Sequence, residues 1–121
     1  MIRKTSYAYG LSAEELDNLI DNILQATADV CGISVANILG KNRHSYLLDA
    51  RCAVSIILHK DLDLSDKAIG KVLNESASAA CYQHNGQCSE HDDGWRGIKT
   101  KLAKIRQKVW PERVPDFKNL S

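Results

Sequence analysis

The chain has 121 residues, of which 44% are hydrophobic and 26% charged, and its formal net charge is +1. These values are ordinary for one soluble globular domain, and no apolar run approaches the roughly 20 residues that a membrane-spanning helix needs. We therefore expect a single domain over residues 1–110, an irregular C-terminal tail over residues 111–121, and no membrane partner.

The charges nearly cancel, but they are unevenly distributed along the chain. Residues 12–31 carry five acids and no Lys or Arg, whereas residues 95–109 carry six bases and no acid. This separation matters more for a polyanionic partner than the net charge does. The first ten residues contain no apolar signal core, so we expect a cytoplasmic protein whose cysteines are reduced thiols. The four cysteines are Cys31, Cys52, Cys81 and Cys88.

Apolar residues recur at helical spacing, and no proline interrupts them before Pro111, which favours an all-α fold of about six helices without a sheet. The first helix begins at the N-cap Ser12, which forms a capping box with Glu15, and ends at Gly32. The third helix has the broadest apolar face and should be the central one. In chain order, the expected helices cover about residues 12–32, 34–40, 45–60, 66–73, 76–90 and 92–109.

The last expected helix starts near Asp92 and carries one continuous apolar seam. Spacings of three and four residues place five side chains on that seam, which should face the body of the protein. Trp95 is the largest of them, so we expect its ring to be largely buried. The seam consists of Trp95, Ile98, Leu102, Ile105 and Val109.

The fourth and fifth expected helices are short and are joined by a turn over residues 74–77. Ser65 caps the fourth helix, and Ser76 or Ser78 caps the fifth, which opens with small residues. A short helix, a tight turn and a second helix form a helix-turn-helix, which predicts a duplex DNA partner. Residues 40–44 form a basic loop whose side chains suit the minor groove or phosphates.

An ordered set of residues between Ile38 and Gly70 carries a family resemblance. In sequence order it reads Ile38-Leu-Gly-Lys-Asn-Arg43, Leu47, Ala50-Arg-Cys-Ala53, Leu64-Ser65 and Ile69-Gly70. These residues and their spacings resemble the C-terminal, DNA-binding domain of the bacterial replication initiator DnaA. The resemblance covers residues 20–90, and its register needs no gap from Lys41 to Tyr82.

The resemblance implies an all-helical, Trp-repressor-like helix-turn-helix domain that binds duplex DNA in a regulatory or replication-related role. In that family an arginine of the basic loop enters the minor groove, which implies this role for Arg43, with Lys41 beside it on the backbone. The arginine of the A-R-x-x-A motif touches phosphate, which implies the same for Arg51. The residues alone leave a second interpretation, in which Arg51 pairs with an acid of the first helix.

The chain departs from the family pattern at the start of the fifth helix. The family sequence R-D-H-T-T, whose side chains meet base edges, is replaced by Ser-Ala-Ser-Ala-Ala over residues 76–80. Glu75 stands where the family usually has glycine. Ser and Ala approach bases closely but offer few hydrogen bonds, so recognition of the initiator's own DNA box is not expected.

We therefore expect a DNA-binding domain with weak sequence dependence. The alternative is a degenerate helix-turn-helix that acts as a protein-interaction or structural module. A shared basic face would favour DNA, whereas Asp61, Asp63 and Glu75 breaking that face would favour the alternative. The expected DNA contacts are Lys41, Asn42, Arg43, Arg51, Lys67, Lys71, Ser76, Ser78 and Gln83.

A zinc site and an enzyme are the remaining hypotheses. Cys81, His84, Cys88 and His91 lie near one face of a helix, but ten helical residues span about 15 Å, and four ligands so spread cannot surround one tetrahedral ion. No nucleophile–base–orienter set and no G-x-x-x-x-G-K-[ST] loop is present, so no ATPase module is expected. We expect no metal, no cofactor and no catalytic residue.

Overall fold

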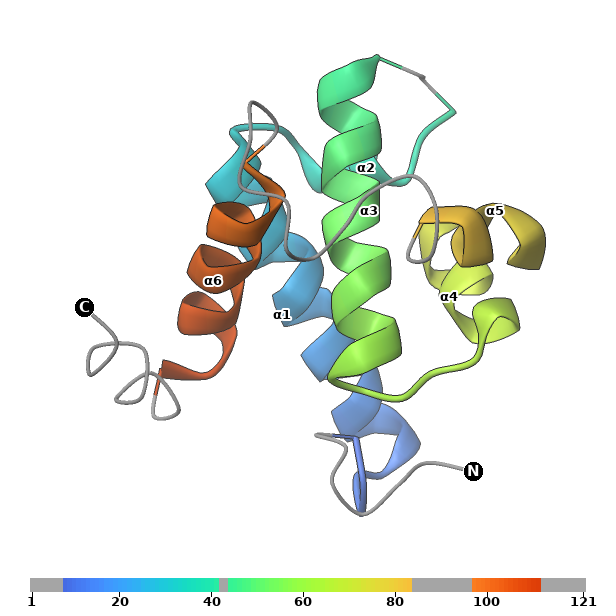
Figure 1. The fold of residues 1–121 in the computed structure, drawn as a ribbon. Coiled ribbons are helices and arrows are strands. Elements are labelled where there is room, and N and C mark those ends of the chain that lie inside the picture. The colour runs from blue at the N-terminus through green and yellow to red at the C-terminus, as the bar shows by residue number, and fades with distance from the viewer. Residues whose placement is uncertain (1–7, 42–43, 84–96, 112–121) are drawn as a thin grey trace.

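The computed structural model describes residues 8–41, 44–83 and 97–111. Within these ranges the chain forms six α-helices and no strand, which confirms the all-α prediction (Figure 1). No helix there is both long and apolar enough to cross a membrane. The helices are α1 (Ala13–Cys31), α2 (Val35–Ile38), α3 (Ser45–Lys60), α4 (Asp66–Leu73), α5 (Ala77–Tyr82) and α6 (Ile98–Val109).

The ends of α1 follow from local chemistry. The Ser12 hydroxyl accepts a hydrogen bond from the Glu15 backbone N–H at 3.1 Å, and the Glu15 carboxylate accepts one from the Ser12 N–H at 3.1 Å. This is the predicted capping box. Gly32 ends the helix with φ at 70°, a left-handed conformation that glycine adopts without steric cost.

The central helix is α3, which Figure 1 shows between α1 and α6 on one side and the α4–α5 pair on the other. All ten consecutive residues from 49 to 58 are buried, so the helix is enclosed around its whole circumference. A helix buried on every face belongs at the centre of a fold. The prediction that the third helix is the most buried one is confirmed for the described residues.

The last helix, α6, packs against α1 and α3 through Ile98, Leu102 and Ile105, all buried, as the apolar seam predicts. It begins later than expected, at Ile98, with Gly97 as its N-cap. The φ angle of Gly97 is 62°, a left-handed conformation that does not occur inside a continuous α-helix. The prediction of one continuous helix from Asp92 is therefore wrong. Three expectations fall outside the described residues: the burial of Trp95, the end of the fifth helix near residue 90, and the irregular tail from 112 to 121.

Candidate nucleic-acid interface

The α4–α5 pair is built by two serine caps and a three-residue turn. Ser65 accepts from the Ala68 N–H at 3.2 Å and starts α4, and Ser76 accepts from the Ala79 N–H at 3.1 Å and starts α5. Of the two predicted caps for the fifth helix, Ser76 is therefore the one used. Asn74 ends α4 in the left-handed conformation, with φ at 58°, and turns the chain toward α5.

The turn lies directly against α4, and Gly70 permits that approach. A Cβ atom at Gly70 would lie 2.6 Å from the backbone oxygen of Glu75 and 3.1 Å from the Ser76 carbonyl carbon. Real Cβ atoms do not come so near a backbone oxygen, so only glycine fits here. On the inner side, the Ser55 hydroxyl donates to the Ala80 carbonyl at 3.2 Å and joins α5 to α3.

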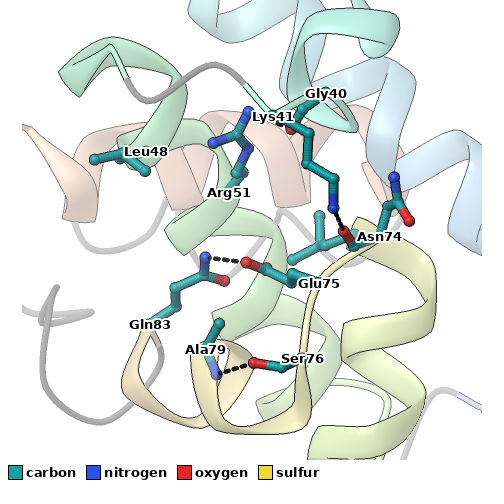
Figure 2. A pocket seen from close by; sticks show the side chains of 10 residues that line it. Gly40, Lys41, Leu48, Arg51, Asn74, Glu75, Ser76, Ala79 and Gln83 are labelled. Atoms are coloured by element: carbon teal, nitrogen blue, oxygen red, sulfur yellow. Dashed lines mark hydrogen bonds between the residues drawn. The ribbon is translucent and has the colours of Figure 1, made fainter.

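The loop after α2 is held against this turn by Lys41. Its ammonium group donates to the Asn74 carbonyl oxygen at 2.8 Å, across 33 residues of sequence (Figure 2). Lys67 and Lys71 are exposed and one turn apart on α4, and Lys71 precedes Asn74 by three residues. Lys41, Lys67 and Lys71 therefore gather along one side of α4, and we call them the lysine face.

The opening of α5 adds a small, exposed surface beside the turn. Ser76, Ala77 and Ser78 are all exposed. The two serines expected as base contacts are thus accessible, although the Ser76 hydroxyl is engaged as the helix cap. Asn42 and Arg43 lie outside the described residues, so the minor-groove contact expected of Arg43 stays a prediction.

Arg51 does not lie on this surface. Its residue is 5% exposed, and its guanidinium donates from Nε to the Ile38 carbonyl at 2.7 Å and from Nη2 to the carbonyls of Asn37 and Gly40 at 3.1 and 2.8 Å. These oxygens lie at the end of α2 and in the turn after it, where helical carbonyls lack partners within the helix. These partners are backbone oxygens and not an acid of α1, and the buried guanidinium is unsuited to a phosphate contact. We leave Arg51 out of the interface.

Gln83 is also turned inward. It is 4% exposed, and its Nε2 donates to the Glu75 carboxylate at 2.9 Å (Figure 2). A side chain so buried is not presented to a base edge, so we leave Gln83 out of the interface. The same bond joins the Glu75 carboxylate to α5, and Glu75 lines the same hollow as Lys41.

A second acid expected to break the basic face points elsewhere. Asp61 accepts two hydrogen bonds from Arg106 of α6, from Nε at 2.8 Å and from Nη2 at 3.0 Å. Paired carboxylates of this kind repel a polyanion less than unpaired ones. Asp63 is half-buried at the turn before α4, with φ at 59°. Two of the three acids, Asp61 and Glu75, are therefore engaged in hydrogen bonds with Arg106 and Gln83.

An aromatic pair beside the basic loop was not identified from the sequence. The rings of His44 and Tyr46 stack with centroids 5.7 Å apart and planes 14° apart, at the start of α3. Tyr46 is 52% exposed, which is unusual for a large apolar side chain in this protein. The only feature of the sequence that could have indicated this pair is its position next to the basic loop. The apolar periodicity places Tyr46 only on the outer side of α3.

Three of the four cysteines lie among the described residues. Cys31, Cys52 and Cys81 form no disulfide, and burial raises the pKa of the Cys31 thiol while nearby Lys101 acts in the opposite direction. In the described ranges no three His, Cys, Asp or Glu residues are grouped so that they could hold a metal ion. His84, Cys88 and His91 lie outside the described residues, so the absence of zinc stays a prediction.

The arrangement is suited to binding and brings together three exposed cations and a small helical surface. It holds the lysine face, the exposed start of α5 and the loop anchored by Lys41 within one part of the fold. Phosphates are the natural ligands of such solvated ammonium groups. No model of a known protein family matches the chain, and no curated protein matches it either.

Proposed function

We propose that the protein binds duplex DNA, with the α4–α5 pair acting as a helix-turn-helix and the lysine face contacting the phosphate backbone. The observation that carries the proposal is the bond from Lys41 to the Asn74 carbonyl at 2.8 Å. It brings Lys41, the first basic residue after α2, to the turn that precedes α5, so that Lys41 and the start of α5 can contact one duplex together. Asp61 is hydrogen-bonded to Arg106 and Glu75 to Gln83, and these bonds support the use of the lysine face as the DNA-binding surface.

The composition of this surface favours backbone contacts over base recognition. Ala77 offers no polar atom to a base, and Ser78 offers one hydroxyl, whereas the three lysines each neutralise a phosphate. Each such contact releases counterions and contributes about −0.9 to the slope of log affinity against log salt. The protein should therefore bind with strong salt dependence and weak sequence dependence.

A salt titration with paired lysine variants tests the proposal. Lys67→Ala combined with Lys71→Ala removes two phosphate contacts and should reduce the salt slope by about 2. The matched control is Lys104→Ala combined with Lys108→Ala, since both residues are exposed, have the same spacing and lie on α6, on the other side of α3. Binding to a random-sequence duplex is measured by fluorescence anisotropy between about 50 and 200 mM salt.

The control pair should leave the slope unchanged. Equal losses in both double variants would mean that net charge, and not the lysine face, drives binding, and the proposal would be wrong. A wild-type protein that does not bind at the lowest salt would also refute it.

A protein-interaction module is the second candidate function. It is favoured by the inward position of Arg51 and Gln83, two of the polar side chains expected to meet DNA. Their burial leaves a surface of small residues at the start of α5. This surface suits contact with a helix of a partner protein as well as with a groove of DNA. The absence of duplex binding at low salt, with an intact fold, would favour this second function.

A further inference from the structure

A pocket lies beside the proposed DNA interface, between the loop after α2, the first half of α3 and the α4–α5 pair (Figure 2). Its volume is about 370 Å³, at the lower end of the range for small-molecule sites. Residues from all of these elements line it, so the pocket is assembled only when the helices pack together. Among the described residues that line it, three carry a charge: Lys41, Arg51 and Glu75.

The guanidinium of Arg51 keeps one donor group available to a ligand. Its three hydrogen bonds to the backbone come from Nε and Nη2, so the two N–H groups of Nη1 are not used. In the described part of the chain, the side-chain atoms that are both enclosed and without a partner are one oxygen of Glu75 and one of Gln83. Nη1 is not among these enclosed atoms, and it is therefore accessible from the pocket that Arg51 lines. The other bonds hold the guanidinium in place, so it receives an anion without rearrangement.

Lys41 supplies a second cation to the same pocket. Its ammonium group uses one of three N–H groups on the Asn74 carbonyl at 2.8 Å, which leaves two. Glu75 is the one acid among the described lining residues, and its Oε2 accepts from Gln83. Two cations and one anion give this lining a net positive charge of one. A ligand with a single negative charge neutralises it, whereas a second negative charge would meet the repulsion of Glu75.

We propose that this pocket binds a small monocarboxylate with an apolar body. The ligand carboxylate accepts hydrogen bonds from Arg51 Nη1 and from the Lys41 ammonium group, and such bonds between opposite charges are stronger than neutral ones. The rest of the ligand packs on the apolar part of the lining, which Leu48, Leu73 and Ala79 provide. The enclosed oxygens of Glu75 and Gln83 take no part in this binding.

The test is an NMR titration of the full, isotopically labelled chain without DNA, so its result is independent of the proposed DNA binding. The probes are benzoate and hexanoate, two monocarboxylates with compact apolar bodies. At least one should shift the amide signals of the lining residues Gly40, Glu75 and Ala79 in a saturable way, with a Kd of about 1–10 mM, which is ordinary for so few atoms. Benzamide and hexanamide, which keep the shapes without the charge, and sodium chloride at equal concentration should leave these signals unchanged.

Four variants localise the binding and test its charge dependence. Lys41→Met, at an exposed position, removes one cation and should weaken binding at least about fivefold. Glu75→Gln removes the opposing negative charge with little change of shape and should strengthen binding about fivefold. Ala79→Leu fills the pocket from α5 and should abolish binding, whereas Ala77→Leu, on the exposed start of the same helix and outside the lining, should keep it.

Three results of the titration would overturn the proposal: neither carboxylate shifts the lining signals, the uncharged amides shift them equally, or Ala79→Leu binds as the wild type does. A Kd that Lys41→Met and Glu75→Gln both leave unchanged would overturn it as well, because the charges of the pocket would then not hold the carboxylate.

Discussion

Replacing Arg51 with alanine should lower the free energy of unfolding by about 3–5 kcal/mol, because a charged, buried donor of three hydrogen bonds is lost. The carbonyls of Asn37, Ile38 and Gly40 would then lose the guanidinium as a donor, and Asn37 alone would keep a backbone donor, the Gly40 N–H. Arg51→Lys keeps the charge but not the planar fork, and should recover about half of the loss. Urea denaturation followed by circular dichroism measures the three proteins.

The control for this prediction is Arg106→Ala. Arg106 also donates two hydrogen bonds, both to Asp61, but its side chain is 35% exposed, so solvent screens the interaction and the cost should be about 1 kcal/mol or less. A cost at Arg51 no greater than that at Arg106 would show that its guanidinium does not hold the end of α2. Arg51 would then have to be reconsidered as a phosphate contact.

Replacing Gly70 with alanine should lower the free energy of unfolding by about 2–3 kcal/mol, through a clash that outweighs the gain of about 1 kcal/mol in helix propensity. The new Cβ would lie 2.6 Å from the Glu75 carbonyl oxygen, which belongs to the backbone of the turn and cannot rotate away. The turn would have to move off α4, and the start of α5 would move with it. Denaturation in urea measures the loss of stability.

Gly40→Ala is the matched control. Its Cβ would lie 3.3 Å from the nearest atom, the Ala36 carbonyl oxygen, so the neighbour needs to give by only a few tenths of an ångström. We expect a change below about 1 kcal/mol. A Gly70→Ala variant that is as stable as the wild type would mean that the α4–α5 approach is looser than the structure shows.

The helix boundaries were predictable because their causes are local. A serine cap bonds to a backbone N–H three residues away, and a glycine in the left-handed conformation ends the helix that precedes it. Ser12, Gly32, Ser65 and Ser76 are all used in this way. Gly97 is the exception, because the apolar seam continues across it and gives no sign that the backbone turns there.

The direction of long polar side chains was not predictable. The carbonyl partners of Arg51 lie 11 to 14 residues away on another element, and the partner of Lys41 lies 33 residues away. Both depend on how the helices pack, which periodicity does not determine. For the same reason Gln83, placed by the sequence near a candidate base-reading helix, is found buried against Glu75.

The central claim, that duplex DNA meets the lysine face and the start of α5, is tested most directly by amide chemical-shift mapping. Isotopically labelled protein is titrated with a random-sequence duplex at low salt. We expect shifts concentrated at Lys41, Lys67, Lys71 and residues 76–78, with α1 and the exposed lysines of α6 unaffected. Shifts centred on α6, or no shifts at all, would contradict it.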